Sequence, residues 1–200
     1  MAYRNLILRL FFSLVFIIIY CTVSFYKFSL VFYLILFIYF LIFIETYIYF
    51  KKYKVIPIIY IFISLIFFLN IELNNKNFLI FNFFIIIVVL FDTFSYLVGK
   101  FFGKIKLINI SPNKTVEGFI GGLIISIFIS LYISYLFNYQ NYFKTLFFII
   151  VIICSAFIGD IIESFYKRKN NLKNSSELIP GHGGIFDRFD SFLFSITFYS

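Results

Sequence analysis

Acidic, basic and glycine residues gather in one polar segment, residues 164–191, of a chain otherwise rich in Phe, Ile, Leu and Tyr. Asp187 and Asp190 lie three residues apart, and His182, the only histidine, precedes Gly183 and Gly184. The basic residues of the segment include Lys167, Arg168, Lys173 and Arg188. Cations attract phosphates, paired aspartates hold a divalent metal, and glycines let backbone approach a ligand closely. The segment therefore predicts a phosphate and metal site.

Helical spacing would bring the acids of this segment together with one upstream acid. Asp160, Ser164 and Lys167 follow one another at i, i+4 and i+7, which places them on one face of a helix. Asp187 and Asp190 are spaced i and i+3, so they share a face of the next helix. Two such helices would bring three carboxylates to one metal ion.

Magnesium is the metal that this ligand set favours. It prefers oxygen ligands and combines one or two carboxylates with waters and phosphate oxygens. His182 has no His or Cys partner at ligand spacing, so zinc is not expected. We predict that Asp160, Asp187 and Asp190 bind Mg²⁺, and a second cation is left open.

A second polar stretch, residues 111–122, leads into another apolar run. Ser111 followed by Pro112 favours a helix start, which would place Lys114 and Thr115 in the first helical turn. First-turn N–H groups and a lysine would form an anion cradle. Close helix packing or a tight interhelical turn explains the glycines that follow, Gly118, Gly121 and Gly122. Together the two stretches predict phosphoryl or nucleotidyl transfer to a membrane lipid.

The elements that must position these residues are membrane helices. Of the 200 residues, 62% are hydrophobic, and the mean hydropathy is +1.02. We predict an all-α, polytopic integral membrane protein with about seven transmembrane helices and a single transmembrane domain, residues 1–200. Residues 1–77 would hold generic spans, the first of them uncleaved, and residues 78–200 a catalytic core. The candidate spans are about 6–26, 28–50, 55–71, 78–99, 118–138, 145–166 and 186–200.

The loops between these spans alternate between several basic residues and a single one. An inside N-terminus puts 14 of the 17 Lys and Arg residues on the inner side. Inner loops of membrane proteins carry such an excess. We therefore predict that the N-terminus and the polar site are cytoplasmic, in a membrane of the bacterial inner type.

Two further acids, Glu45 and Asp92, lie inside apolar runs. Each precedes a basic loop by a few residues, so both would lie near the cytoplasmic boundary. An acid within a span costs about 2.5–3.5 kcal/mol on insertion scales. Each of these acids is interpreted either as snorkelling to the interface or pairing with a nearby lysine, or as part of a site. The first interpretation is favoured for Glu45.

The polar segment resembles the C-terminal motif of the phosphatidate cytidylyltransferases, also called CDP-diacylglycerol synthases. The matching residues are Ser164, Lys167, Arg168, Lys173, Ile179, Pro180, His182, Gly183, Gly184, Asp187, Arg188 and Asp190. Upstream segments around Asp92, Ser111–Gly118 and Gly159–Ser164 are also similar to the family, so the resemblance covers residues 80–200. Asn174 departs from it, because the family motif has an acid there.

The resemblance implies that CTP and phosphatidate react to give CDP-diacylglycerol and pyrophosphate. The metal would then orient the phosphates, and Lys167, Arg168 and Lys173 would clamp them. Ser111, Lys114, Thr115, Ser164, Gly183 and Gly184 would contact the nucleotide. His182 would position a phosphate or order the glycine turn, with proton transfer as an alternative. Membrane lipids are expected partners, nucleic acid is not, and a homodimer is left open.

Three other functions are alternatives to this one. A relative of the family could transfer the nucleotide to another anionic lipid phosphate. A degenerate, non-catalytic membrane scaffold would not explain the charge around His182. A transporter would place its charges near the midplane and often shows inverted repeats, whereas here the acids lie towards one side.

Overall fold

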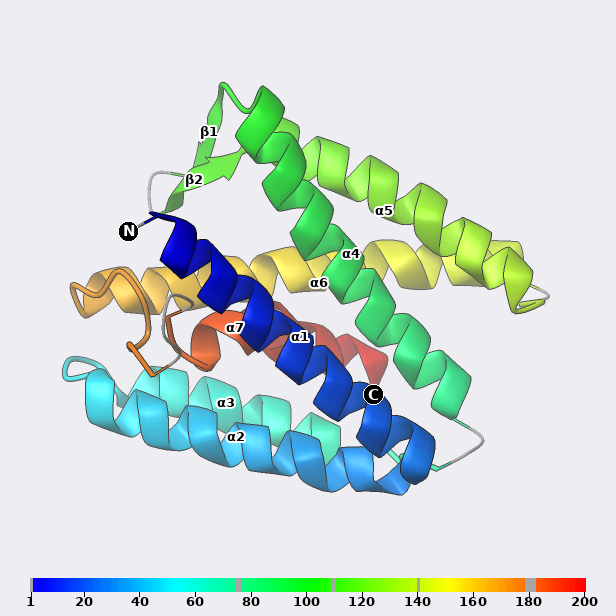
Figure 1. The fold of residues 1–200 in the computed structure, drawn as a ribbon, viewed down its shortest axis with the longest axis horizontal. Coiled ribbons are helices and arrows are strands. Elements are labelled where there is room, and N and C mark those ends of the chain that lie inside the picture. The colour runs from blue at the N-terminus through cyan, green and yellow to red at the C-terminus, as the bar shows by residue number, and fades with distance from the viewer. Residues whose placement is uncertain (1, 75–76, 109–110, 140, 179–182) are drawn as a thin grey trace. The chain divides into compact units, whose positions relative to one another are not determined.

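The computed structural model describes residues 2–74, 77–108, 111–139, 141–178 and 183–200, with side chains from residue 14 onward apart from 112 and 113 (Figure 1). Within these residues the chain forms seven α-helices and two short strands. The helices are α1 (Ala2–Tyr26), α2 (Ser29–Tyr49), α3 (Val55–Leu69), α4 (Phe78–Phe102), α5 (Val116–Leu136), α6 (Tyr142–Lys169) and α7 (Phe186–Tyr199). The strands are β1 (Lys106–Ile108) and β2 (Ser111–Thr115).

Each predicted apolar run coincides with one of these helices. Four of them, α2, α4, α5 and α6, are long and apolar enough to cross a membrane, judged over the described residues. Helices α3 and α7 have 15 and 14 residues, and a spanning helix needs about 20. The mostly helical, membrane-integral architecture is therefore supported, whereas the count of seven spans stays a prediction.

The loop before α5 differs from the sequence-based expectation. Residues 111–115 form the strand β2, which pairs with β1 in antiparallel register, Lys106 opposite Thr115 (Figure 1). The predicted helix start at Ser111 is wrong, because Thr115 has an extended backbone and is itself the N-cap of α5. A proline is tolerated in an edge strand as well as in a first helical turn, so the Ser-Pro signal could not distinguish the two.

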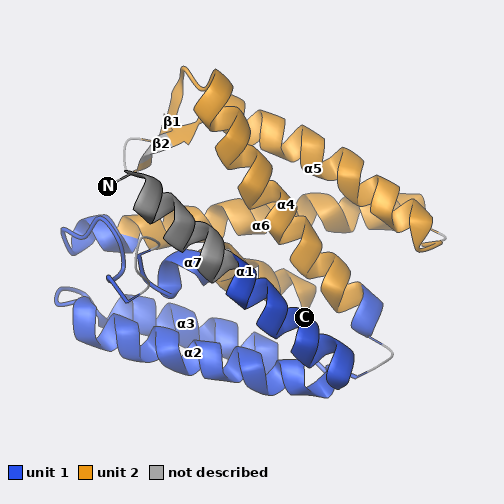
Figure 2. Cartoon of the chain, in the orientation of Figure 1, with its two compact units in different colours: residues 1–79, 166–189 blue, residues 80–165, 190–200 orange. Residues whose placement is uncertain are grey.

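The chain divides into two compact units, coloured separately in Figure 2. Unit 1 contains residues 1–79 and 166–189, and unit 2 contains residues 80–165 and 190–200. The boundaries fall inside α6 and α7, so both helices contribute residues to both units. The single-domain organisation stays a prediction.

Unit 1 has its core where α2 meets α3. Val31, Ile35, Tyr39 and Ile42 recur every three or four residues on α2 and are buried, as expected for one face of a helix. The Tyr39 hydroxyl lies 2.6 Å from the hydroxyl of Ser64 on α3, which satisfies both polar groups inside this apolar interface.

Unit 2 contains a close contact between α4 and α5. A Cβ atom added at Gly122 would lie 2.7 Å from the Ser95 Cα, and one at Gly118 would lie 3.0 Å from the Gly99 Cα. Such distances are too short for a side chain, so glycine is what lets the two backbones approach. The close packing expected of these glycines is confirmed.

Candidate functional site

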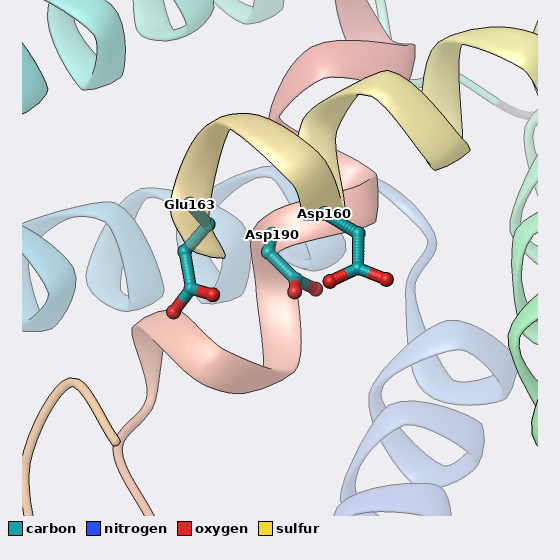
Figure 3. Close-up of side chains that lie close together, drawn as sticks. All are labelled: Asp160, Glu163 and Asp190. Atoms are coloured by element: carbon teal, nitrogen blue, oxygen red, sulfur yellow. The ribbon is translucent and has the colours of Figure 1, made fainter. Parts of the chain in front are cut away.

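Three carboxylates converge in unit 2. Asp160 and Glu163 project from α6, and Asp190 projects towards them from α7 (Figure 3). One oxygen from each lies within 4.8 Å of the others, and Glu163 is fully buried. This spacing suits three ligands of a single cation.

Gly159 explains how α7 comes so near to Asp160. A Cβ atom at position 159 would lie 2.5 Å from the Asp190 carbonyl oxygen and 2.9 Å from the Phe194 Cβ. The missing side chain therefore lets the backbone of α7 lie directly against α6, one residue before Asp160. The Asp190 Oδ1 atom also accepts the Ser191 N–H at 2.8 Å.

Two further charged residues of unit 2 join this carboxylate group. The Lys114 Nζ atom, at the end of β2, lies 2.7 Å from the Asp160 Oδ2 atom. The Asp92 Oδ1 atom, on α4, accepts a hydrogen bond from the Ser191 hydroxyl at 3.0 Å. Four carboxylates thus accompany one lysine among the described residues, and this excess of negative charge favours a bound cation.

The residues expected to form an anion cradle are arranged differently from the prediction. The Thr115 hydroxyl accepts the Gly118 N–H at 3.1 Å, so a first-turn donor of α5 is already occupied. Lys114 precedes the helix and pairs with Asp160 instead of extending a cradle. Ser111 begins β2, opposite Ile108. The Glu117 carboxylate accepts the Lys104 and Ile105 N–H groups and thereby closes the loop.

A second polar group lies in unit 1, around Asp187. The Lys167 Nζ atom lies 2.6 Å from the Asp187 Oδ1 atom, and both side chains are largely buried. The Asp187 Oδ2 atom accepts the N–H groups of Ser175 and Gly184, each at 2.9 Å. These three partners of Asp187 belong to unit 1, and the carboxylate group described above consists of Asp160, Glu163 and Asp190.

The glycine turn before α7 requires Gly183 itself. Its φ is +84°, a conformation that other residues rarely adopt, and a Cβ atom there would lie 2.5 Å from the Asp187 Oδ2 atom. Gly184 is buried beside it. His182 lies outside the described residues, so its predicted role stays a prediction.

The remaining predicted residues occupy the polar segment in different environments. Ser164 is buried on α6, within unit 2. The Arg168 guanidinium donates to the Leu172 carbonyl at 3.0 Å and so shapes the turn that follows α6. Lys173 and Arg188 are exposed.

Two acids were missing from the predicted site. Glu163 follows Asp160 by three residues, and this i, i+3 spacing was the signal for it. Glu45 is fully buried, and its Oε2 atom accepts the N–H groups of Ile185 and Phe186 at 2.8 and 3.1 Å. The interpretation of Glu45 as snorkelling or pairing with lysine is therefore wrong, because backbone N–H groups are its partners among the described residues.

The carboxylate group fits a magnesium ion by its chemistry. Its three candidate ligands are all oxygens, and carboxylate oxygens are what magnesium prefers. Lys114 pairs with Asp160, so one lysine accompanies the three candidate ligands. Phosphate oxygens and water would complete the coordination.

The comparisons with known proteins agree with the resemblance seen in the sequence. A family model described as "Cytidylyltransferase family" matches residues 1–200. A protein of Staphylococcus saprophyticus named phosphatidate cytidylyltransferase is 42% identical over 140 residues, which cover 68% of this chain and 53% of that protein. Proteins with the same name from Staphylococcus haemolyticus and Staphylococcus aureus are 40% and 41% identical over 138 and 137 residues, covering 68% of this chain and 52% of each relative. The chain thus spans about half the length of the curated relatives it matches.

Proposed function

Because the chain belongs to the cytidylyltransferase family, we propose that it is a membrane enzyme that transfers a cytidylyl group from CTP to phosphatidate. The products would be CDP-diacylglycerol and pyrophosphate. The observation that carries this proposal is the convergence of Asp160, Glu163 and Asp190 beside Lys114. Such a group suits a reaction in which charged phosphates must be held and neutralised.

We assign the cation of this group as Mg²⁺, with Asp160, Glu163 and Asp190 as the residues that would hold it. When bound, magnesium would neutralise phosphate charge and orient the triphosphate for in-line attack. Glu163 replaces Asp187 as the third proposed magnesium ligand, because Asp187 already binds Lys167 and two N–H groups. A second cation stays a prediction.

The reaction needs binding and orientation more than proton transfer. A phosphatidate oxygen forms a bond to the α-phosphorus of CTP, and the bond from that phosphorus to the bridging oxygen of pyrophosphate breaks. The attacking group is already an anion, so no strong general base is required. We assign Lys167, Arg168 and Lys173 to phosphate binding, as the resemblance implies, and Arg188 is a further candidate catalytic residue. His182 would order the glycine turn or a phosphate.

The membrane topology belongs to the same proposal. Seven spans with an inside N-terminus would place 14 of the 17 basic residues on the cytoplasmic side of a bacterial-type inner membrane. CTP is a cytoplasmic metabolite, which is consistent with a site on that side. The four helices long enough to cross a membrane support the integral character of the chain.

The test is conversion of phosphatidate by the purified chain in detergent micelles. With CTP and magnesium, we expect CDP-diacylglycerol by mass spectrometry and an equal amount of pyrophosphate. Asp160→Asn is the matched inactive control, because it keeps the size of the side chain. Product from a prenyl phosphate but not from phosphatidate would overturn the lipid assignment. The absence of product from either lipid would overturn the enzymatic function.

A further inference from the structure

Glu45 connects two segments of unit 1 that lie 140 residues apart in sequence. It lies near the end of α2, and its carboxylate is fully buried. Its Oε2 atom accepts the N–H of Ile185 at 2.8 Å and that of Phe186, the first residue of α7, at 3.1 Å. Glu45 therefore supplies the N-terminal cap of α7 from a distant helix.

This arrangement compensates a charge that would otherwise be costly to bury. A carboxylate inside an apolar span is stabilised by charged hydrogen bonds and by the positive end of a helix dipole, and the start of α7 offers both. The first N–H groups of a helix have no partner within the helix. The Glu45 Oε2 atom and the N–H groups at the start of α7 thus satisfy each other.

The same carboxylate also borders the glycine turn. A Cβ atom at Gly184 would overlap the Glu45 Oε1 atom and the Ser175 hydroxyl, so these two oxygens line the space that the glycine leaves open. Neither oxygen has a hydrogen-bond partner among the described residues. Position 184 therefore requires glycine, because the Glu45 and Ser175 oxygens occupy the space that a side chain there would need.

The backbone N–H groups of three consecutive residues, 184–186, donate hydrogen bonds to two carboxylates. Asp187 accepts the N–H of Gly184, and Glu45 accepts those of Ile185 and Phe186. Asp187 also binds Lys167 and the Ser175 N–H. A shift of the turn away from Glu45 would move Gly184 and, with it, the carboxylate of Asp187.

We propose that Glu45 is a positioning residue, which fixes the first turn of α7 and thereby the Lys167–Asp187 pair. It touches neither substrate nor metal in this role. The inference rests on the proposed function for its effect on catalysis, whereas the positioning itself is a structural property. It also gives a role to residues 1–77, for which the sequence predicted only generic spans.

Hydrogen exchange tests the positioning without any activity assay. Peptides covering residues 183–189 are compared in the wild type, Glu45→Gln and Glu45→Ala in detergent micelles. Loss of a charged acceptor should speed exchange in these peptides by roughly tenfold or more in Glu45→Ala, and by less in the isosteric Glu45→Gln. Glu72→Gln is the matched control, because Glu72 is an exposed acid of the same unit. Peptides of α3 report whether the fold is retained.

The outcomes separate positioning from general stability. Faster exchange confined to residues 183–189 supports the proposal. Unchanged exchange there in Glu45→Ala, or equal loss of protection in α3 and in the turn in both variants, overturns it.

Steady-state kinetics test whether Glu45 affects catalysis through Asp187. Glu45→Gln should lower kcat more than it raises KM for CTP. It should add little to the defect of Asp187→Asn, because residues that act as one unit are not additive. Additive defects would overturn the coupling. A wild type without activity would refute the proposed function alone, since the exchange experiment still decides the positioning.

Discussion

The Lys167 Nζ atom lies 2.6 Å from the Asp187 Oδ1 atom, and the two side chains are only 13% and 10% exposed. The lysine lies in the last turn of α6, and the aspartate lies in the first turn of α7. Their ion pair therefore closes the polar loop between the two helices. Because the pair is largely buried, loss of either partner would remove the ion pair that balances the other charge.

Asp187→Asn should lower turnover by more than about 100-fold, comparable to the loss of a major electrostatic stabiliser. The variant keeps the size of the side chain but removes the charge that Lys167 and two N–H groups bind. Steady-state rates at saturating magnesium measure the effect. Near-normal turnover would remove Asp187 from the functional machinery.

A double-mutant cycle with Lys167→Met tests the pair itself. Because both changes break one interaction, the double variant should be no less stable than the worse single variant, with a coupling of about 0.5–3 kcal/mol. Thermal unfolding in detergent provides the measurement. Additive destabilisation would show that the two side chains do not depend on each other.

Glu163→Gln and Asp190→Asn should each weaken magnesium binding and reduce turnover by more than about 100-fold, because each removes one carboxylate of the proposed ligand set. Calorimetric titration with Mg²⁺ and rates over a magnesium series are the measurements. Glu72→Gln removes an exposed acid and should leave both unchanged. A chelator should abolish wild-type activity, and excess magnesium should restore it. Wild-type magnesium affinity in Glu163→Gln would exclude Glu163 as a ligand.

Gly159→Ala should separate Asp190 from Asp160, because the new methyl group would overlap the Asp190 carbonyl oxygen. Overpacking of this kind costs about 1–3 kcal/mol of stability. We expect a lower unfolding temperature and a higher magnesium concentration for half-maximal activity. Ile158→Ala, on an exposed position of the same helix, is the control. An unchanged magnesium response in a folded Gly159→Ala protein would contradict the packing argument.

Single cysteines at Glu72 and Lys106 should react with an impermeant thiol reagent from opposite sides of the membrane. Both positions are exposed, and the seven-span prediction places Lys106 in a cytoplasmic loop and Glu72 in an external one. The natural cysteines, Cys21 and Cys154, must first be replaced by alanine. Labelling of intact cells and of inverted vesicles decides the side. Reaction of both positions from one side would rule out the seven-span model.

Asn174→Asp should raise activity modestly or lower the magnesium requirement, because it restores the acid of the family motif beside Lys173. The Asn174 Cβ atom lies 3.3 Å from the place of a Cβ at Gly183, so the change is made next to the glycine turn. Rates over a magnesium series compare the two forms. An inactive wild type rescued by this change would identify the natural chain as a degenerate enzyme.

The positions of the helices could be predicted from the sequence with good accuracy. Long apolar runs between polar loops are a local signal, and all seven runs coincide with helices. The spacing within a helix was equally informative, since Asp160 and Ser164 do lie on α6, and Asp187 and Asp190 on α7. Strand β2 was missed because Ser-Pro is compatible with both a helix start and an edge strand.

The sequence by itself determined which residue types are available for phosphate and metal chemistry, because composition and the spacing of nearby residues are local properties of the chain. Only the tertiary structure decided which of them meet. Periodicity shows which side chains share a face of one helix, but not which faces of different helices pack together. That choice depends on close approaches such as the one at Gly159 and on distant caps such as Glu45. The three-carboxylate group therefore includes Glu163, whereas Asp187 binds Lys167, because packing brings those particular side chains together.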